Sequence, residues 1–341
     1  MPPDDRYARQ TILPEIGPDG QARLGEAHAV VVGCGALGAM QAQLLARAGV
    51  GRLTLIDRDL VERSNLQRQL LFTDDDAEAS RPKAVAAEAA LRLINPTIRV
   101  DGMVEDLRAV NAATLLAGAT LLCDGSDSFE TRYLINDYAV REQIPWVYGG
   151  VIGTGGLVLP ILPGETACLR CVFETPPAAG DLPTCETAGV LGPAAAIIGA
   201  LQATESLKIL TGARDAVRRG LLRVELWMAE YQALAIGEPR SDCPTCGAHD
   251  YAWLEGRAGA RAARLCGREA IQLLPHDARP PALDVIAARL TPEWTVVHNP
   301  HYLRARREGM TVTLFRDGRM IVDGTTDEAE ARSVGARVIG V

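Results

Sequence analysis

The stretch AHAVVVGCGALG at residues 27–38 decides the fold. Its compact apolar start is typical of a buried parallel strand. The glycine-rich turn that follows leads into an apolar helical run extending to about Ala48. Asp57 ends the next apolar strand, about 20 residues beyond Gly38, which is the spacing typical of dinucleotide-binding sequences. A strand, a glycine turn, a helix and an acidic residue in this order predict a dinucleotide-binding βαβ unit.

The chemistry of this unit concerns a nucleotide phosphate and a ribose. Gly33, Gly35 and Gly38 let the backbone approach a phosphate, and the helix N-terminus favours negative charge. Asp57 is suited to accept hydrogen bonds from ribose hydroxyls. The pattern indicates an adenosine nucleotide and leaves NAD, FAD and ATP open. We interpret Cys34 inside the turn as a small side chain.

The same alternation of helix and strand continues downstream. Helices are expected over 82–94, 110–116 and 130–142, and strands over 98–104, 119–124 and 146–150. Beyond residue 150 we expect a strand over 154–162, a loop over 173–182, a long helix over 190–210 and one or two strands over 221–235. The alternation predicts an α/β fold with a Rossmann-like, doubly wound, mostly parallel sheet.

Charge and hydropathy exclude several classes of protein. The 341 residues carry a formal net charge of -8 and no basic run. This argues against nucleic acid as the partner, because phosphate binding needs clustered Lys and Arg. No apolar stretch reaches the roughly 20 residues of a membrane helix, and the first residues are polar, unlike a secretory signal. We therefore expect a cytoplasmic protein without a membrane partner.

A polar cluster after Asp57 bears on which nucleotide binds. Residues 62–69 read ERSNLQRQ, and a dehydrogenase has no need for so many cations and amides beside the ribose site. Charge on a triphosphate is stabilised by Arg and Lys clamps and a metal. Arg68 and Lys83 are candidates for the clamp. Two amides of the same stretch are candidates to hold phosphate oxygens: Asn65 and Gln69.

Asp127 is the candidate magnesium ligand. It follows the strand that ends at Asp124, and Mg²⁺ prefers one or two carboxylates together with phosphates. The sequence contains no Gly-x-x-x-x-Gly-Lys-Ser/Thr loop, which excludes that class of ATPase. Each charge taken alone is more typical of a solvated surface residue than of a binding site, so the interpretation rests on the cluster.

Four cysteines form two Cys-x-x-Cys pairs: Cys168, Cys171, Cys243 and Cys246. Four thiolates suit a closed, structural, tetrahedral zinc site. A redox dithiol is the alternative for such spacing. We expect zinc, because two such pairs occur in one chain.

Nine segments resemble the ThiF/MoeB/HesA family, the bacterial relatives of ubiquitin-activating enzymes. They run in order from about Arg6 to Gly247: RYARQ (6–10), GCGALG (33–38), DRD (57–59), SNLQRQ (64–69), PK (82–83), DGSD (124–127), CLRC (168–171), TCETAGV (184–190) and CPTC (243–246). The resemblance implies that the C-terminal Gly-Gly carboxylate of a ubiquitin-like sulfur-carrier protein attacks the α-phosphate of Mg-ATP. The products are an acyl-adenylate and pyrophosphate.

The resemblance also implies roles for single residues. Asp57 would hold the ribose, and Arg68 and Lys83 the phosphates. Asp127 would bind magnesium, and Arg9 would reach the phosphates from the other subunit of a homodimer. Two further residues of the matching segments are expected nucleotide contacts: Asp59 and Ser126. One departure is Ser128, where the family usually has Asn, and it places a nucleotide contact at that position in doubt.

Cys185 matches the cysteine that can form a covalent link to the carrier in ThiF-like proteins and that can be dispensable in MoeB-like ones. An isolated cysteine is otherwise usually an inert core residue, and both interpretations stay open. A sulfur donor such as a cysteine desulfurase or a rhodanese is implied as a further partner. Two rival functions are a nicotinamide-dependent oxidoreductase and a non-catalytic scaffold that binds a ubiquitin-like protein.

The domain organisation follows from these motifs. We expect an ATP-binding adenylation domain over 1–247, with an N-terminal arm and the zinc-bound element. A small α+β extension over 248–341 should contain a hairpin around Asp317-Gly318, a strong turn signal, and then a helix over 326–336. Cys266 in this extension is interpreted as structural.

Overall fold

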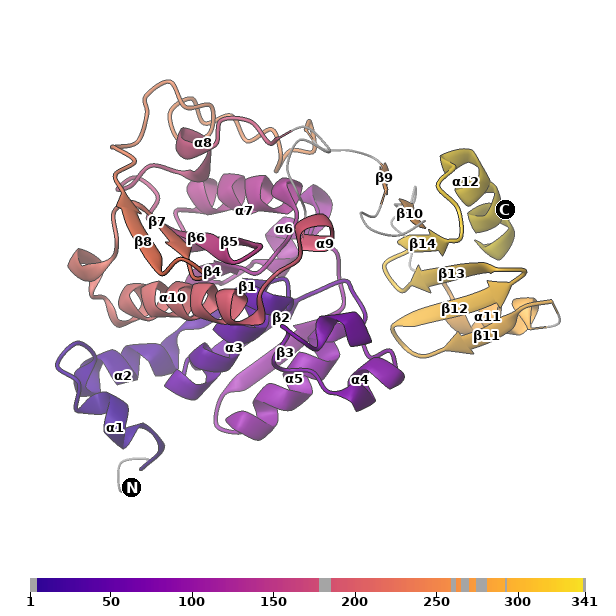
Figure 1. The fold of residues 1–341 in the computed structure, drawn as a ribbon, viewed down its shortest axis with the longest axis horizontal. Coiled ribbons are helices and arrows are strands. Elements are labelled where there is room, and N and C mark those ends of the chain that lie inside the picture. The colour runs from indigo at the N-terminus through magenta and orange to yellow at the C-terminus, as the bar shows by residue number, and fades with distance from the viewer. Residues whose placement is uncertain are drawn as a thin grey trace. The chain divides into compact units, whose positions relative to one another are not determined.

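The computed structural model describes residues 5–177, 185–258, 262–264, 270–273, 281–291 and 293–339. The chain divides into two compact units, Met1–Ala258 and Gly259–Val341 (Figure 1). Residues 248–258 therefore belong with the first unit, beyond the expected boundary at 247. The reason is local packing, since the Trp253 amide donates to Asp137 Oδ2 at 3.0 Å and the Trp253 ring lies 5.3 Å from that of Tyr133.

The first unit is built on an eight-stranded sheet in the order β3-β2-β1-β4-β5-β6-β7-β8. The strands are β1 (His28–Val32), β2 (Arg52–Ile56), β3 (Arg99–Met103), β4 (Leu121–Asp124), β5 (Trp146–Ile152), β6 (Gly155–Ile161), β7 (Leu221–Glu225) and β8 (Glu230–Leu234). The first five are parallel, and the last three join antiparallel. The predicted Rossmann-like, mostly parallel sheet is confirmed.

Helices cover both faces of this sheet, because alternate strand residues point to opposite sides. Val31 packs into one apolar core, and Val30 and Val32 pack into another. Figure 1 shows α3 and α10 on one side of the sheet and α7 on the other. The helices are α1 (Ala8–Thr11), α2 (Gly17–Glu26), α3 (Ala36–Ala48), α4 (Asp74–Glu78), α5 (Lys83–Ile94), α6 (Ala109–Leu115), α7 (Phe129–Glu142), α8 (Leu169–Val172), α9 (Cys185–Ala188) and α10 (Gly192–Thr211).

Two further helices of the first unit lie outside the regular alternation of strand and helix. α2 lies in the N-terminal arm, and Pro18 stands in its first turn, where a missing N–H does no harm. α4 is one short turn whose capping box joins Thr73 and Asp76. No helix in the described part of the chain is long and apolar enough to cross a membrane.

The second unit contains a six-stranded antiparallel sheet in the order β11-β12-β13-β14-β10-β9. Its elements are β9 (Ala262–Arg264), β10 (Ala270–Leu273), α11 (Leu283–Leu290), β11 (Thr295–His298), β12 (Tyr302–Arg307), β13 (Met310–Phe315), β14 (Met320–Asp323) and α12 (Glu328–Ile339). The hairpin expected around Asp317-Gly318 joins β13 to β14, and Gly318 has the positive φ of 84° that favours glycine. The expected final helix is α12. Cys266 lies outside the described residues.

Candidate active site

Two glycine turns meet where the strand order changes direction, between β1 and β4. This is the position at which doubly wound sheets bind ligands. The Gly125 amide donates to Val32 O at 2.8 Å, so the turn after β4 continues the pairing with β1. A Cβ added to Gly38 would lie 1.8 Å from Gly33 O, and one added to Gly125 would lie 2.4 Å from it. The turns therefore pack backbone against backbone, which only glycine permits.

We expect Gly38→Ala to destabilise the protein and Gly35→Ala to leave its stability near wild type. The added methyl at residue 38 would overlap Gly33 O, whereas at residue 35 its nearest neighbour would lie 3.7 Å away. Overpacking usually costs about 1–3 kcal/mol, and this overlap belongs at or above the upper end. Urea unfolding of both variants provides the measurement. Equal stability of the two would show that the turn has more room than this packing allows.

Asp57 ties the first turn to the end of β2. Its Oδ2 accepts from the Cys34 amide at 2.6 Å, and its Oδ1 accepts from the Asp59 amide at 2.7 Å. Burial raises the pKa of the Asp57 carboxyl, and the Lys83 ammonium offsets part of this rise. Each carboxylate oxygen keeps a further lone pair that a ribose hydroxyl can use. Burial also raises the pKa of the Cys34 thiol well above its ordinary value, so this thiol stays neutral.

Lys83 begins α5 and points to Asp59. Its Nζ lies 3.2 Å from Asp59 Oδ2, and its amide donates to Asp59 O at 2.8 Å. Burial works to lower the pKa of Lys83, but the carboxylates of Asp59, Asp57 and Asp127 outweigh it and raise the pKa. Lys83 is therefore a permanent cation beside the glycine turns, and Asp59 holds it there.

The stretch 62–69 folds as a short 3-10 turn (Arg63–Asn65) and its continuation. Asn65 Oδ1 accepts from the Glu62 amide at 3.2 Å, and Arg68 Nη1 donates to Ser64 O at 2.9 Å. Gln69 is 4% exposed, and its Oε1 has no hydrogen-bond partner in the described structure. Gln69 Nε2 faces the glycine turn, because a Cβ on Gly35 would lie 3.9 Å from it.

Asp127 is exposed at the end of a fixed turn, and its carboxylate has no hydrogen bond or ion pair with the described residues. The turn is held from behind by Asp124 and Arg132, whose Nε lies 3.1 Å from Asp124 Oδ2. Arg132 Nη2 donates to Ser126 O at 2.8 Å and to Gly149 O at 3.1 Å. The Ser126 amide and hydroxyl both donate to Asp124 Oδ1.

Arg132 could not be identified as a site residue from the sequence. An arginine one helical turn into a helix reads as solvated, and only the neighbouring position of β4 and β5 buries it. Its guanidinium lies 5.2 Å from the centroids of both the Phe129 and Tyr148 rings. Ser126 thus contributes its backbone and hydroxyl to this fixed turn, and Ser128 caps α7 by accepting from the Thr131 amide.

Arg9 is not brought to this site within one chain. The arm packs at the C-terminal ends of α3 and α5, where Gln10 Nε2 donates to Ala48 O at 2.9 Å and Arg6 Nη1 to Ile94 O at 3.2 Å. The site lies at the N-terminal ends of the same helices. α3 has 13 residues, which corresponds to about 20 Å. The exposed Arg9 side chain cannot cover that length.

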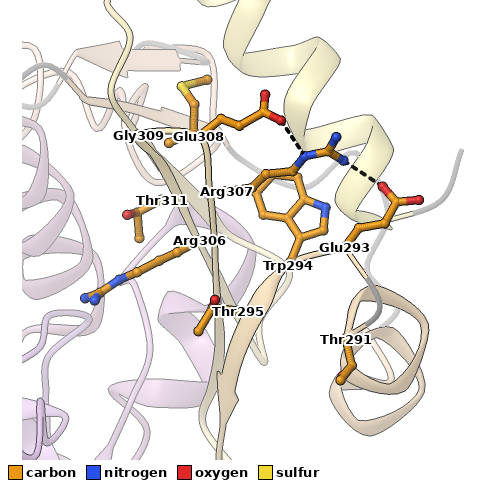
Figure 2. A pocket seen from close by; sticks show the side chains of 10 residues that line it. Thr291, Glu293, Trp294, Thr295, Arg306, Arg307, Glu308, Gly309 and Thr311 are labelled. Carbon is orange, nitrogen blue, oxygen red and sulfur yellow. Dashed lines mark hydrogen bonds and ion pairs between the residues drawn. The ribbon is translucent and has the colours of Figure 1, made fainter.

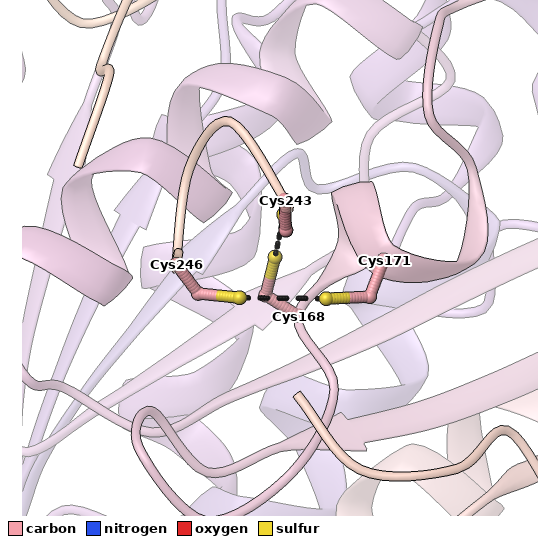
Figure 3. Close-up of side chains that lie close together, drawn as sticks. All are labelled: Cys168, Cys171, Cys243 and Cys246. Carbon is pink, nitrogen blue, oxygen red and sulfur yellow. Dashed lines mark hydrogen bonds between the residues drawn. The ribbon is translucent and has the colours of Figure 1, made fainter. Parts of the chain in front are cut away.

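The side chains of the two Cys-x-x-Cys pairs converge on one point. Their sulfur atoms all lie within 4.8 Å of one another, with 3.6 Å between Cys168 and Cys243 and 3.4 Å between Cys171 and Cys246 (Figure 3). Four sulfurs at about 2.3 Å from a tetrahedral zinc would be about 3.8 Å apart. Asn136 supports the group, since its Nδ2 lies 3.8 Å from Cys168 Sγ.

Two features lie apart from these groups. Cys185 begins α9, and its side chain is outside what the structure describes. An open surface pocket belongs to the second unit, where Trp294 and Arg306 line it and Arg307 pairs with Glu293 (Figure 2). That pocket contains none of the predicted site residues, so it does not enter the account of the reaction.

Comparisons with known proteins agree with this geometry. Residues 7–245 match the ThiF family. A Bacillus subtilis protein named "Sulfur carrier protein ThiS adenylyltransferase" is 41% identical over 98% of this chain and 99% of its own length. A Thermus thermophilus "Sulfur carrier protein adenylyltransferase" is 43% identical over 71% of this chain and 90% of its own length. The crystal structure "E. coli MccB + ATP" has a TM-score of 0.63 at 22% identity, over 72% of this chain and 75% of that one. At this level of identity, the likeness to MccB shows a shared fold and nothing about activity.

Proposed function

Because this chain belongs to the ThiF family, we propose that it adenylates the C-terminal carboxylate of a ubiquitin-like sulfur-carrier protein with ATP. The observation that carries the proposal is the site at the β1–β4 switch point. There Asp57, Lys83 and Asp127 surround two glycine turns. The names of the relatives support the same activity.

The reaction is a displacement at phosphorus. An oxygen of the carrier's carboxylate forms a bond to the α-phosphorus, and the bond to the bridging oxygen breaks. Pyrophosphate leaves with that electron pair. We assign Lys83 and Arg68 to the phosphate charge, with Gln69 and Asn65 lining the turn. Asp127 would hold the Mg²⁺ that neutralises the phosphates.

We further propose that Arg9 completes the site of a second subunit in a homodimer. The support is its place at the far ends of α3 and α5, about 20 Å from the site of its own chain. Ile12 and Leu13 beside it are 69% and 47% exposed, as expected of a surface that a partner covers.

For the carrier, we propose a ThiS-type protein. The Bacillus relative with that name matches both units of this chain, whereas the Thermus relative matches 71% of it. A cytoplasmic reaction with a cysteine desulfurase or a rhodanese as sulfur donor fits this chemistry. Exchange assays with each carrier from the same genome test the choice, and a carrier of another pathway as the sole active one would contradict it.

ATP-dependent stabilisation separates this function from its rivals. A ligand that binds the folded state raises the melting temperature by mass action. Mg-ATP should therefore raise it and NAD should not. A rise with NAD alone would favour a nicotinamide-dependent oxidoreductase. A rise with Mg-ATP but no product with any carrier would favour a non-catalytic scaffold.

We propose that the four cysteines hold one structural zinc. The donor set and the sulfur distances fit a closed tetrahedral site. We expect about one zinc per chain in protein prepared without chelators, and we expect Cys243→Ser to release it and lower the melting temperature. Cys34→Ser, a change of another buried cysteine, is the control that should keep the metal. Fresh protein free of zinc would contradict the assignment.

Cys185 is proposed to act after adenylation by attacking the carbonyl carbon of the acyl-adenylate, with AMP as the leaving group. The thiol itself would give a thioester, and a Cys185 persulfide, formed by transfer of sulfane sulfur from the sulfur donor, would give an acyl disulfide with the carrier. Adenylation itself needs no cysteine. We expect Cys185→Ser to keep pyrophosphate exchange and to lose a reductant-sensitive enzyme–carrier adduct on a denaturing gel. An equal amount of adduct in the mutant would make Cys185 structural, and loss of exchange in a folded mutant would refute the separation of the two steps.

A further inference from the structure

Arg58 lies next to the candidate ribose-binding residue Asp57, and the motifs leave it without a role. It directly follows the ribose acceptor Asp57 at the end of β2, and its side chain is 30% exposed. Its Nη1 lies 3.1 Å from Asp106 Oδ1, and its Nε lies 3.8 Å from Asp59 Oδ1. An arginine with two carboxylate partners at the rim of a binding site is held in one orientation.

Asp106 and Asp59 are themselves fixed. The carbonyl of Asp106 accepts from Asn111 Nδ2 at 2.9 Å, and Asn111 Oδ1 caps α6. The other oxygen of Asp59 holds Lys83. Negative and positive side chains therefore alternate from Asp106 through Arg58 and Asp59 to Lys83. Burial works to lower the pKa of Arg58, but the carboxylates of Asp106 and Asp59 outweigh it and raise the pKa.

The place of Arg58 relative to the ligand follows from the fold. The glycine turns take the phosphates and Asp57 takes the ribose, so the base lies beyond the ribose. Arg58 and Asp106 stand there, because β3 is the next strand outward and the Asp57 amide donates to Met103 O at 3.1 Å. A guanidinium bonds carboxylates in its plane and stacks on an aromatic ring through its face, so the two kinds of contact are compatible in one arginine.

We propose that the guanidinium of Arg58 forms the wall on which the purine base of ATP stacks, and that Asp106 positions it. This inference rests on the proposed function, since it takes ATP as the ligand. Arg58 thereby contributes to binding of the nucleoside part and not to the charge of the phosphates, which Lys83 and Arg68 meet.

Three variants at one position test this. Arg58→Lys keeps the charge and loses the flat group that can stack, whereas Arg58→Phe keeps a flat group that can stack and loses the charge. Loss of base stacking should weaken Mg-ATP binding on the order of 10-fold in Arg58→Lys, and Arg58→Phe should stay close to wild type. Arg58→Ala should bind Mg-ATP as weakly as Arg58→Lys. Tripolyphosphate, which has no base, should bind all of them alike. Calorimetric titration without any carrier measures each affinity, and melting temperatures show that the variants fold.

A double-mutant cycle tests the positioning role of Asp106. Asp106→Asn should weaken Mg-ATP binding in the wild-type background and have little further effect with Arg58→Phe. If Arg58→Lys retains affinity for Mg-ATP and Arg58→Phe loses it, Arg58 acts through its charge and the proposal is overturned. Wild-type affinity in all variants would also overturn it, because Arg58 would then contribute nothing to binding. Wild-type protein that binds Mg-ATP but never adenylates a carrier would instead refute the proposed function alone.

Discussion

Replacing Asp127 by alanine is expected to lower carrier-dependent pyrophosphate exchange on the order of 10²-fold or more, the scale for removing a preorganised electrostatic group. Asp127 is exposed on a turn that Asp124 and Arg132 hold from behind. Its carboxylate forms no hydrogen bond or ion pair with the described residues, so its oxygens are available to a cation. The expected loss should appear mainly in kcat, because the metal acts on charge that develops during the displacement.

Two variants serve as controls for this prediction. Asp127→Asn keeps the size and one oxygen, so it should lose most of the activity and keep the fold. Asp59→Asn should weaken nucleotide binding through Lys83, whose Nζ lies 3.2 Å from Asp59 Oδ2. Near-normal exchange in Asp127→Ala, with loss in Asp59→Asn, would instead assign the metal to Asp59.

Arg9→Ala should abolish adenylation while leaving the melting temperature unchanged. Arg9 is exposed in α1 and makes no hydrogen bond or ion pair with other residues in the part of the chain described here, so its loss costs the fold nothing. The expected effect arises at the site of the other subunit, where the phosphates would lose one cation. Arg6→Ala is the matched control from the same arm, since Arg6 is engaged by Ile94 O.

Mixing two inactive proteins tests whether Arg9 acts across subunits. A heterodimer of Arg9→Ala and Arg68→Ala subunits has one site with both arginines intact and one with neither. Random mixing of a homodimer should therefore restore roughly one quarter of the sites. Absence of rescue in verified heterodimers would place Arg9 in the site of its own chain, against the position of the arm seen here.

The features that could be read from the sequence are those with local causes. The glycine turn, Asp57 and the alternation of helix and strand follow from periodicity and turn chemistry, and the strand and helix positions agree with the structure to within a few residues. The two Cys-x-x-Cys pairs are equally local patterns. That they lie together could be predicted because four thiolates suit one shared metal ion.

Residues whose role depends on strand order could not be found this way. Arg132 gains its partners only because β4 and β5 lie side by side and bring Asp124 and Gly149 to the same helix. Arg58 meets Asp106 only because β2 pairs with β3. The distance of Arg9 from the site likewise follows from helix length and packing, which motif spacing does not contain.

The most direct test of the account is carrier-dependent exchange of labelled pyrophosphate into ATP. The enzyme is incubated with Mg-ATP, labelled pyrophosphate and a ThiS-type carrier, either intact or lacking its last glycine. We predict rapid exchange with the intact carrier, none without a carrier, and a large loss with the shortened one, because the C-terminal carboxylate is the nucleophile. Exchange that proceeds equally without a carrier, or that never appears with any ubiquitin-like carrier of the same genome, would contradict it.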